Sequence, residues 1–231
     1  MKQTIAWPIY DKTLYENKWK DNKGYAAIIL NAVRIICTTE PIELESLKTN
    51  WIQHLKIQKS KLSRLFVYVG QNKYFSCYFP FIINRKGDKS KVYMKDIEIT
   101  EKLLSESFSL LYAVRESYFY NKYTEEDEES SYSIEAYKVI EELITAEPCY
   151  IRYDYDTIGE KSHVHPLIHF DINMSKAGTF KVGLSNPLST ISFENLFDKS
   201  VDCLYLVEHD RIEKVSNLRR YSFCKKKRKR K

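Results

Sequence analysis

The sequence predicts an α+β fold, a mostly antiparallel sheet with helices packed on one side. Two observations support this prediction. Apolar residues recur at helical spacing in the first part of the chain, and alternating or aromatic-rich segments follow. Short turns join those later segments, which favours antiparallel over parallel pairing. The 231 residues, 43% of them hydrophobic, also supply enough apolar side chains for a buried core.

The expected organisation is one α+β domain over residues 1–231, ending in a basic tail at 225–231. No repeat period recurs along the chain, which argues against a solenoid or a propeller. The alternative is a subdivision into 1–122, with helices and a β-meander, and 132–224, with a helix and a His-rich hairpin. We prefer one domain because the meander and the hairpin can join one sheet.

Helices are expected first. Gly24–Cys37 is strongly apolar, Pro41 marks a break, and Ile42–Leu65 carries apolar residues at roughly helical spacing. This interpretation places His54 in a helix. From Leu65 onward the period shortens, and turns at 70–73 and 85–88 divide a three-stranded meander with strands at 66–69, 74–83 and 91–97.

Polar caps mark the later helices. Thr100 precedes a helix expected at 101–118, and Ser133 precedes another that Pro148 ends. The acidic run Glu125–Glu129 is interpreted as an exposed loop leading into that second helix. A strand is expected near 179–184, and Ser189 or Thr190 opens a short final helix.

A concentration of titratable residues of mixed kind falls between the second capped helix and this last strand, and it is the one place where the sequence indicates chemistry. Tyr150–Asp156 carries Arg152, Asp154 and Asp156, and three of the five histidines, His163, His165 and His169, lie within seven residues. As strands, both segments put polar residues on one face and apolar residues on the other. We expect an antiparallel hairpin with Arg152 opposite His169 and Asp156 opposite His165, and with a loop at 157–164.

The candidate catalytic residues are Arg152, Asp154, His165 and His169. A guanidinium can hold a phosphate with two parallel bonds, and imidazoles can donate and accept protons. On one strand the two histidines would stand roughly 13 Å apart, so sharing a phosphate or a divalent metal would require the strand to bend or bulge. The cofactor therefore stays undefined, with a divalent metal as one option. The non-catalytic interpretation is an exposed sheet face with ordinary cross-strand pairs.

The formal net charge of +6 is concentrated at the end of the sequence. Without the seven cations of the tail the rest of the chain carries a charge of −1. The tail predicts binding to nucleic acid, and a nuclear import signal or a solvated end are the alternatives. Its residues are Lys225, Lys226, Lys227, Arg228, Lys229, Arg230 and Lys231. Because no apolar run approaches about 18 residues and Pro8 interrupts the first segment, we expect a cytoplasmic protein with no membrane partner.

The last third of the chain resembles an uncharacterised bacterial family, a domain of unknown function. Its members share an Arg-x-Asp strand, a His-Pro-x-x-His strand and a Pro-Leu-Thr-like turn into a helix. The matching segments here are Tyr150–Asp156, His165–Asp171, Asn186–Ser189 and Phe193–Phe197. The resemblance implies a bacterial or phage-linked source, in a mobile or defence locus. It implies no activity, but it carries over four positions, Arg152, Asp154, His165 and His169.

Taken together, these features predict a nucleic-acid-processing protein, a small nuclease or a toxin-like effector of a bacterial defence or mobile locus. The alternative is a non-catalytic nucleic-acid-binding or adaptor subunit with a protein partner from the same locus. A pure protein-interaction module is a third option. The sequence has no glycine-rich phosphate loop, no Gly-x-Ser-x-Gly turn and no His-Glu-x-x-His motif, so NTP hydrolysis, serine hydrolysis and dinucleotide redox chemistry are disfavoured.

Overall fold

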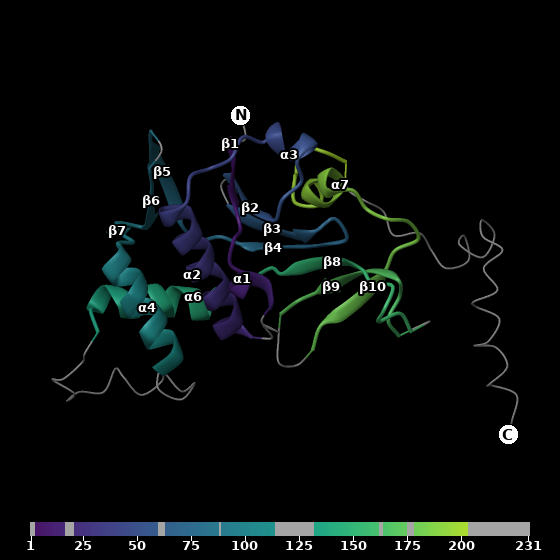
Figure 1. Ribbon diagram of the computed structural model, residues 1–231. Helices are drawn as coiled ribbons and strands as arrows, with labels where there is room; N and C mark the ends of the chain where they lie inside the picture. Colours follow the sequence, from purple (N-terminus) through teal and green to yellow (C-terminus); the bar gives the residue numbers. More distant parts are fainter. Residues whose placement is uncertain are drawn as a thin grey trace, which may run out of the picture. The chain divides into compact units, whose positions relative to one another are not determined.

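A computed structural model describes residues 3–16, 21–59, 63–87, 89–113, 132–161, 164–174 and 178–202. The predicted α+β class is confirmed: most of the strands form one antiparallel sheet (Figure 1). The chain divides into two compact units, Met1–Pro187 and Leu188–Lys231. In the part of the chain that the structure describes, no helix combines the length and the apolar character needed to cross a membrane.

The main sheet of the first unit has seven strands in the order β1-β2-β3-β4-β8-β9-β10, and each strand runs antiparallel to its neighbours. The pairing of β4 with β8 joins the first half of the chain to the later hairpin in one sheet. The strands are β1 (Gln3–Pro8), β2 (His54–Lys59), β3 (Arg64–Gly70), β4 (Lys73–Tyr78), β8 (Ile151–Tyr155), β9 (Ile168–Ile172) and β10 (Phe180–Gly183).

A second, three-stranded sheet contains β5 (Ile82–Lys86), β6 (Lys89–Met94) and β7 (Ile97–Glu98). The predicted meander is therefore wrong in two respects. Its middle strand is two strands, β4 and β5, which belong to different sheets, and a turn between β6 and β7 interrupts its last strand at 91–97. Pro80 separates β4 from β5, since it lacks the N–H that a ladder requires. The flanking Phe79 and Phe81 are both buried, and their rings pack against each other with centroids 5.6 Å apart.

The helical interpretation of 42–65 is also wrong for most of that stretch. Its described residues contain only the short α3 (Ser46–Thr49) before β2 and the start of β3, so His54 begins a strand. Leu55 and Ile57 are buried in β2, which lies between β1 and β3. Pairing on both sides outweighs the helical spacing of the apolar residues, because tertiary context overrides a local preference. Strand β1 was not predicted.

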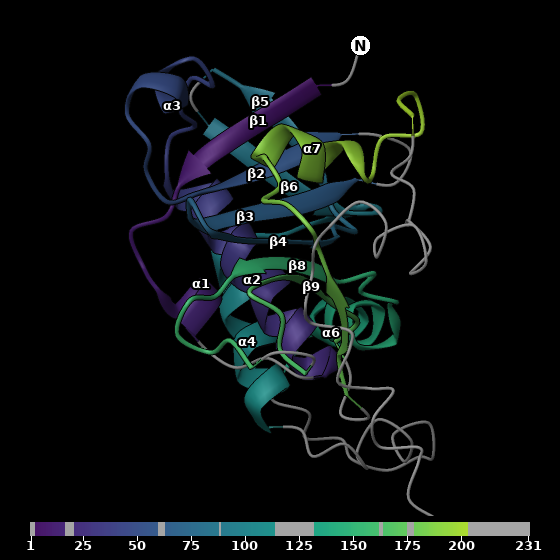
Figure 2. The same cartoon turned by 90° about the vertical axis from the view of Figure 1, so that its right-hand side faces the viewer.

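Four helices of the first unit, α1, α2, α4 and α6, lie on one side of the main sheet (Figures 1 and 2), as predicted. Apolar residues of α2, α4, α6 and the strands make up one core, including Leu30, Leu111, Val139 and Leu65. The helix bounds are α1 (Thr13–Glu16), α2 (Asn22–Thr38), α4 (Glu101–Ala113) and α6 (Ile134–Thr145).

Three predicted caps are confirmed. Thr100 Oγ1 accepts a hydrogen bond from Leu103 N at 3.2 Å, Ser133 Oγ from Ala136 N at 3.3 Å, and Ser189 Oγ from Ser192 N at 3.1 Å. Ser189 opens α7 (Thr190–Asn195) of the second unit. Some expectations lie outside the described residues: the end of the helix at 101–118, the acidic run Glu125–Glu129, His163 and the basic tail.

Candidate metal centre

The candidate site is built on β8, β9 and β10. Arg152 faces Asp171 and Asp154 faces His169 across the β8–β9 pair. The predicted register, with Arg152 opposite His169, is wrong by two residues. A shift of two leaves every side chain on its predicted face, so the polar residues still share one surface. The shift brings Asp171, which was not among the predicted catalytic residues, beside Arg152.

Local structure in the hairpin loop explains this register. The Asp156 carboxylate accepts hydrogen bonds from Ile158 N at 3.1 Å and from Gly159 N at 2.8 Å. Lys161 and His165 form an isolated bridge, and the backbone N–H of Asp156 donates to Leu167 O at 2.8 Å. Asp156 therefore pairs with Leu167, and the loop closes before β9 begins.

Strand β10 adds a residue that sequence reasoning missed. Lys181 lies opposite Asp171, and Gly183 lies opposite His169. A β-carbon at Gly183 would approach Pro166 Cγ to 3.1 Å, so this glycine permits a close approach of β10 to the turn before His169. In the predicted strand at 179–184, the period of two would put Lys181 and Gly183 on one face, which is the signal that could have identified Lys181. Nothing local to that strand, however, shows which β9 residue lies opposite Lys181.

His169 is fully buried, and its surroundings define which ring nitrogen carries the hydrogen. Its Nδ1 lies 2.7 Å from Pro166 O. Because a carbonyl oxygen only accepts, Nδ1 is the donor, and Nε2 of the neutral ring presents a lone pair. Burial lowers the pKa of His169, and the nearby Lys181 ammonium lowers it further. The ring is therefore held as a neutral imidazole, the form that binds metals.

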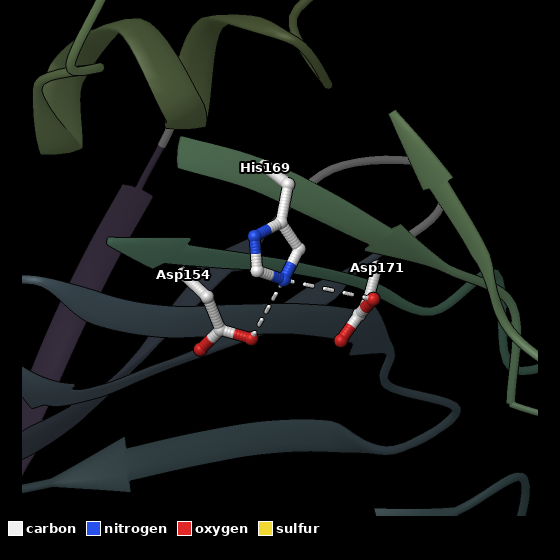
Figure 3. Close-up of side chains that lie close together, drawn as sticks. All are labelled: Asp154, His169 and Asp171. Carbon is white, nitrogen blue, oxygen red and sulfur yellow. Dashed lines mark ion pairs between the residues drawn. The ribbon is translucent and has the colours of Figure 1, made fainter. Parts of the chain in front are cut away.

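The Nε2 lone pair points between two carboxylates (Figure 3). It lies 3.7 Å from Asp154 Oδ2 and 3.9 Å from Asp171 Oδ1. One ligand atom from each of the three buried residues falls within 4.8 Å of the others. Two carboxylates and an imidazole form a donor set that suits divalent cations such as Mn²⁺, Mg²⁺ or Zn²⁺. The hairpin and its register thus create a candidate metal centre.

Two cationic side chains reach the same carboxylates. Arg152 donates from Nε to Asp154 Oδ2 at 2.6 Å and from Nη2 to Asp171 Oδ2. Lys181 Nζ lies 2.5 Å from Asp171 Oδ1 and 3.0 Å from His169 Nε2. Burial opposes the charge of Arg152, but Tyr150, Asp154 and Asp171 outweigh it and raise its pKa. Arg152 therefore stays charged and holds the two carboxylates in place.

The predicted residue His165 lies beside this cluster rather than within it. Its ring meets His169 edge-on, with centroids 4.6 Å apart. The two histidines do not lie on one strand, as the expected separation of roughly 13 Å assumed, because β9 begins only at Ile168 and His165 lies in the preceding loop. His165 Nε2 lies 3.4 Å from Asp156 Oδ2, yet this buried nitrogen makes no hydrogen bond within the described residues.

The exposed sheet face of the non-catalytic interpretation is not what the structure shows at the centre of this cluster. Asp154, His169 and Asp171 are all buried, with relative exposures of 7%, 0% and 2%. Buried polar groups are costly unless they are paired, so this surface belongs to the interior of a fold or a site.

His54 lies elsewhere in the sheet, where its Nδ1 bonds to Ile52 O at 2.8 Å and its ring stacks on Tyr68.

Three of the four predicted catalytic residues, Arg152, Asp154 and His169, belong to one cluster of contacting side chains. The fourth, His165, packs against the ring of His169. Asp171 and Lys181 complete that cluster. Comparisons of the chain with protein-family models, with curated proteins and with solved structures found no match to it. The resemblance to a bacterial family of unknown function stays a prediction.

Proposed function

We propose that this protein is a metal-dependent nuclease that hydrolyses phosphodiester bonds in nucleic acid. One observation carries the proposal: Asp154, His169 and Asp171 direct three ligand atoms at one another within 4.8 Å, and all three residues are buried. A divalent cation held there would polarise a phosphoryl oxygen and lower the pKa of a bound water. Such a centre suits an ester that is itself negatively charged.

The residues of the cluster have different roles in this proposal. Asp154, His169 and Asp171 are the metal ligands, and Pro166 O fixes the tautomer and orientation of the imidazole. Arg152 is a positioning residue, because its bonds from Nε and Nη2 both run to ligand carboxylates. This role differs from the predicted grip on the scissile phosphate, for which the guanidinium has fewer donors left.

His165 is the proposed proton donor or acceptor. Its side chain is 29% exposed, so part of the ring, unlike that of His169, reaches solvent although Nε2 itself is buried. Its unbonded Nε2 faces Asp156, which can orient the ring as a carboxylate partner orients a catalytic histidine. The ring contact with His169 keeps this group within reach of the metal centre.

A nucleic acid is the proposed substrate because of the charge of the chain. The run Lys225–Lys231 supplies seven cations that can displace counterions from phosphates. Lys73 adds a half-exposed ammonium 3.8 Å from Asp154 Oδ1. The family resemblance further supports a toxin-like effector of a bacterial defence or mobile locus as the biological setting.

Cleavage of labelled RNA and DNA, measured with Mn²⁺ or Mg²⁺ and with EDTA, tests the proposal. We expect metal-dependent cleavage that EDTA abolishes and that Asp154→Asn lowers by about 100-fold or more. Asp96→Asn is the matched control, since Asp96 is exposed in the turn between β6 and β7. Asn replaces Asp without opening a cavity, whereas His169→Ala would remove a fully buried ring and unfold part of the site. Equal cleavage by Asp154→Asn and Asp96→Asn would contradict the proposal.

A second candidate function is that of a non-catalytic nucleic-acid-binding or adaptor subunit. The observation that favours it is the charge balance of the cluster: two carboxylates face Arg152 and Lys181, as in a purely structural network. Deletion of Lys225–Lys231 would then remove most of the salt-dependent binding, and no preparation would cleave nucleic acid. Cleavage by the intact protein would exclude this alternative.

A further inference from the structure

The Lys181 ammonium lies where a bound cation would have to be. Its Nζ is 2.5 Å from Asp171 Oδ1 and 3.0 Å from His169 Nε2. These are two of the three groups that form the candidate metal centre, and the same two atoms are 3.9 Å apart. Asp171 Oδ1 and His169 Nε2 therefore already contact the positive charge of Lys181.

Metal–ligand distances make the two positions exclusive. A divalent cation binds carboxylate oxygen and imidazole nitrogen at about 2.1 Å. Since the two ligand atoms are 3.9 Å apart, such a cation lies close to the line that joins them. From any direction around that line it falls within about 3 Å of Lys181 Nζ, a separation at which two cations repel strongly.

We propose that Lys181 and the divalent cation exchange at one position: the ammonium fills the centre until the metal displaces it. This inference rests on the proposed metal-dependent function and adds a residue that regulates metal binding. Without either cation, Asp171 would be a buried carboxylate that keeps only Arg152 as a cationic partner among the described residues. Lys181 thus balances the charge of Asp171 in the empty centre, at the cost of weaker metal affinity.

The displaced ammonium has a route out of the cluster. The Lys181 side chain is 27% exposed, and among the described residues β10 is an edge strand that pairs with β9 alone. The lysine side chain has four rotatable bonds, so its ammonium can leave the cluster while the backbone stays in place. The released charge then stands beside the metal centre, where a phosphate of the substrate would bind.

Titration of the protein with Mn²⁺ in a calorimeter tests the exchange. We expect Lys181→Met to bind Mn²⁺ at least about tenfold more tightly than the unmodified protein, because the competing charge is gone. Lys91→Met is the matched control. It removes the same charge from a side chain of β6 that is 61% exposed and 2.8 Å from Glu98 Oε1, in the three-stranded sheet, so the Mn²⁺ affinity should change by less than about threefold.

A second measurement uses the unmodified protein, in case Lys181→Met fails to fold. Acylation of lysine amines, read by mass spectrometry, should label Lys181 several-fold faster when Mn²⁺ is present. Lys48, which is exposed and paired with Glu45 on α3, should be labelled equally under both conditions.

The outcomes separate this inference from the proposed function. Two results would overturn the exchange but leave the metal centre in place. One is equal Mn²⁺ affinity of the unmodified protein and the two lysine variants, and the other is Mn²⁺ binding that leaves the labelling rate of Lys181 unchanged. Weaker binding by Lys181→Met would overturn it as well, because Lys181 would then support the ligands rather than compete with the metal. Absence of Mn²⁺ binding to every protein would overturn both proposals.

Discussion

Arg152 illustrates how much depends on one side chain of this cluster. Its guanidinium donates to Asp154 and Asp171, which lie on neighbouring strands and are both buried. Two carboxylates at this separation repel each other, and the fork geometry of the guanidinium lets one residue bridge them. Lysine, with a single charged nitrogen, would not reproduce both bonds.

Substitution of Arg152 should therefore destabilise the fold through the carboxylates that it leaves behind. We expect Arg152→Met to lower the free energy of unfolding by about 2–4 kcal/mol. Because the arginine is 30% exposed, the lower end of that range is expected. Adding Asp171→Asn should recover about 1 kcal/mol, since one of the unpaired charges is then absent.

Urea denaturation of the two single variants and of the double variant measures this coupling. Additive losses, with no recovery in the double variant, would show that Arg152 does not act through Asp171. Recovery would support the positioning role over the predicted contact with a phosphate.

At the scale of the element, the loop that joins β8 to β9 determines which residues of the two strands lie opposite each other in the site. Asp156 accepts two backbone hydrogen bonds inside this loop and faces His165. Bonds from backbone N–H groups stabilise a carboxylate, and that of Gly159 is the main reason why the pKa of Asp156 is lowered. The loop thereby fixes the register that sets Asp154 opposite His169.

Gly159→Ala tests this role of the loop. The new β-carbon would lie 2.3 Å from Asp156 Oδ2, so the carboxylate would have to leave its backbone donors. We expect the pKa of Asp156 to rise toward its ordinary value, because the charged form loses those bonds. NMR titration of the aspartate side-chain carbons measures the change.

The same argument gives the sign of a pH dependence. A carboxyl group whose pKa is lowered by folding stabilises the fold above its ordinary pKa and loses that contribution as the pH falls through the folded value. The unmodified protein should therefore exceed Gly159→Ala in stability by more at neutral pH than in acid. An equal difference at both pH values would mean that Asp156 is not involved.

At the scale of the whole molecule, the candidate centre combines distant parts of the sequence. Asp154, His169 and Lys181 come from three strands, and β4, from the first half of the chain, supports them through its pairing with β8. A ligand that binds only the folded arrangement stabilises the fold by mass action. Metal binding and unfolding should consequently be linked.

We expect Mn²⁺ to raise the thermal unfolding midpoint of the protein. At a free concentration of about 100 times Kd the gain in stability is about 2.7 kcal/mol. Asp171→Asn, which removes one ligand charge, should show a much smaller gain. Differential scanning calorimetry measures both. The same rise in the two proteins would place the cation elsewhere on the molecule.

Local patterns predicted a good part of the fold and the faces of the site. Thr100, Ser133 and Ser189 start helices because their hydroxyl groups accept bonds from nearby N–H groups, which is a property of a few consecutive residues. Alternation likewise assigned Arg152 and Asp154 to one face of a strand. By contrast, helical spacing gave the wrong element for β2, since pairing with β1 and β3 decides that segment.

The sequence by itself determined which side chains share a face, because side-chain direction repeats every two residues along a strand. Only the tertiary structure decided their partners. Registers that differ by two residues present identical faces, so no local pattern distinguishes Arg152 opposite His169 from Arg152 opposite Asp171. Lys181 lies beside Asp171 because β10 pairs with β9. No pattern within either segment specifies that pairing.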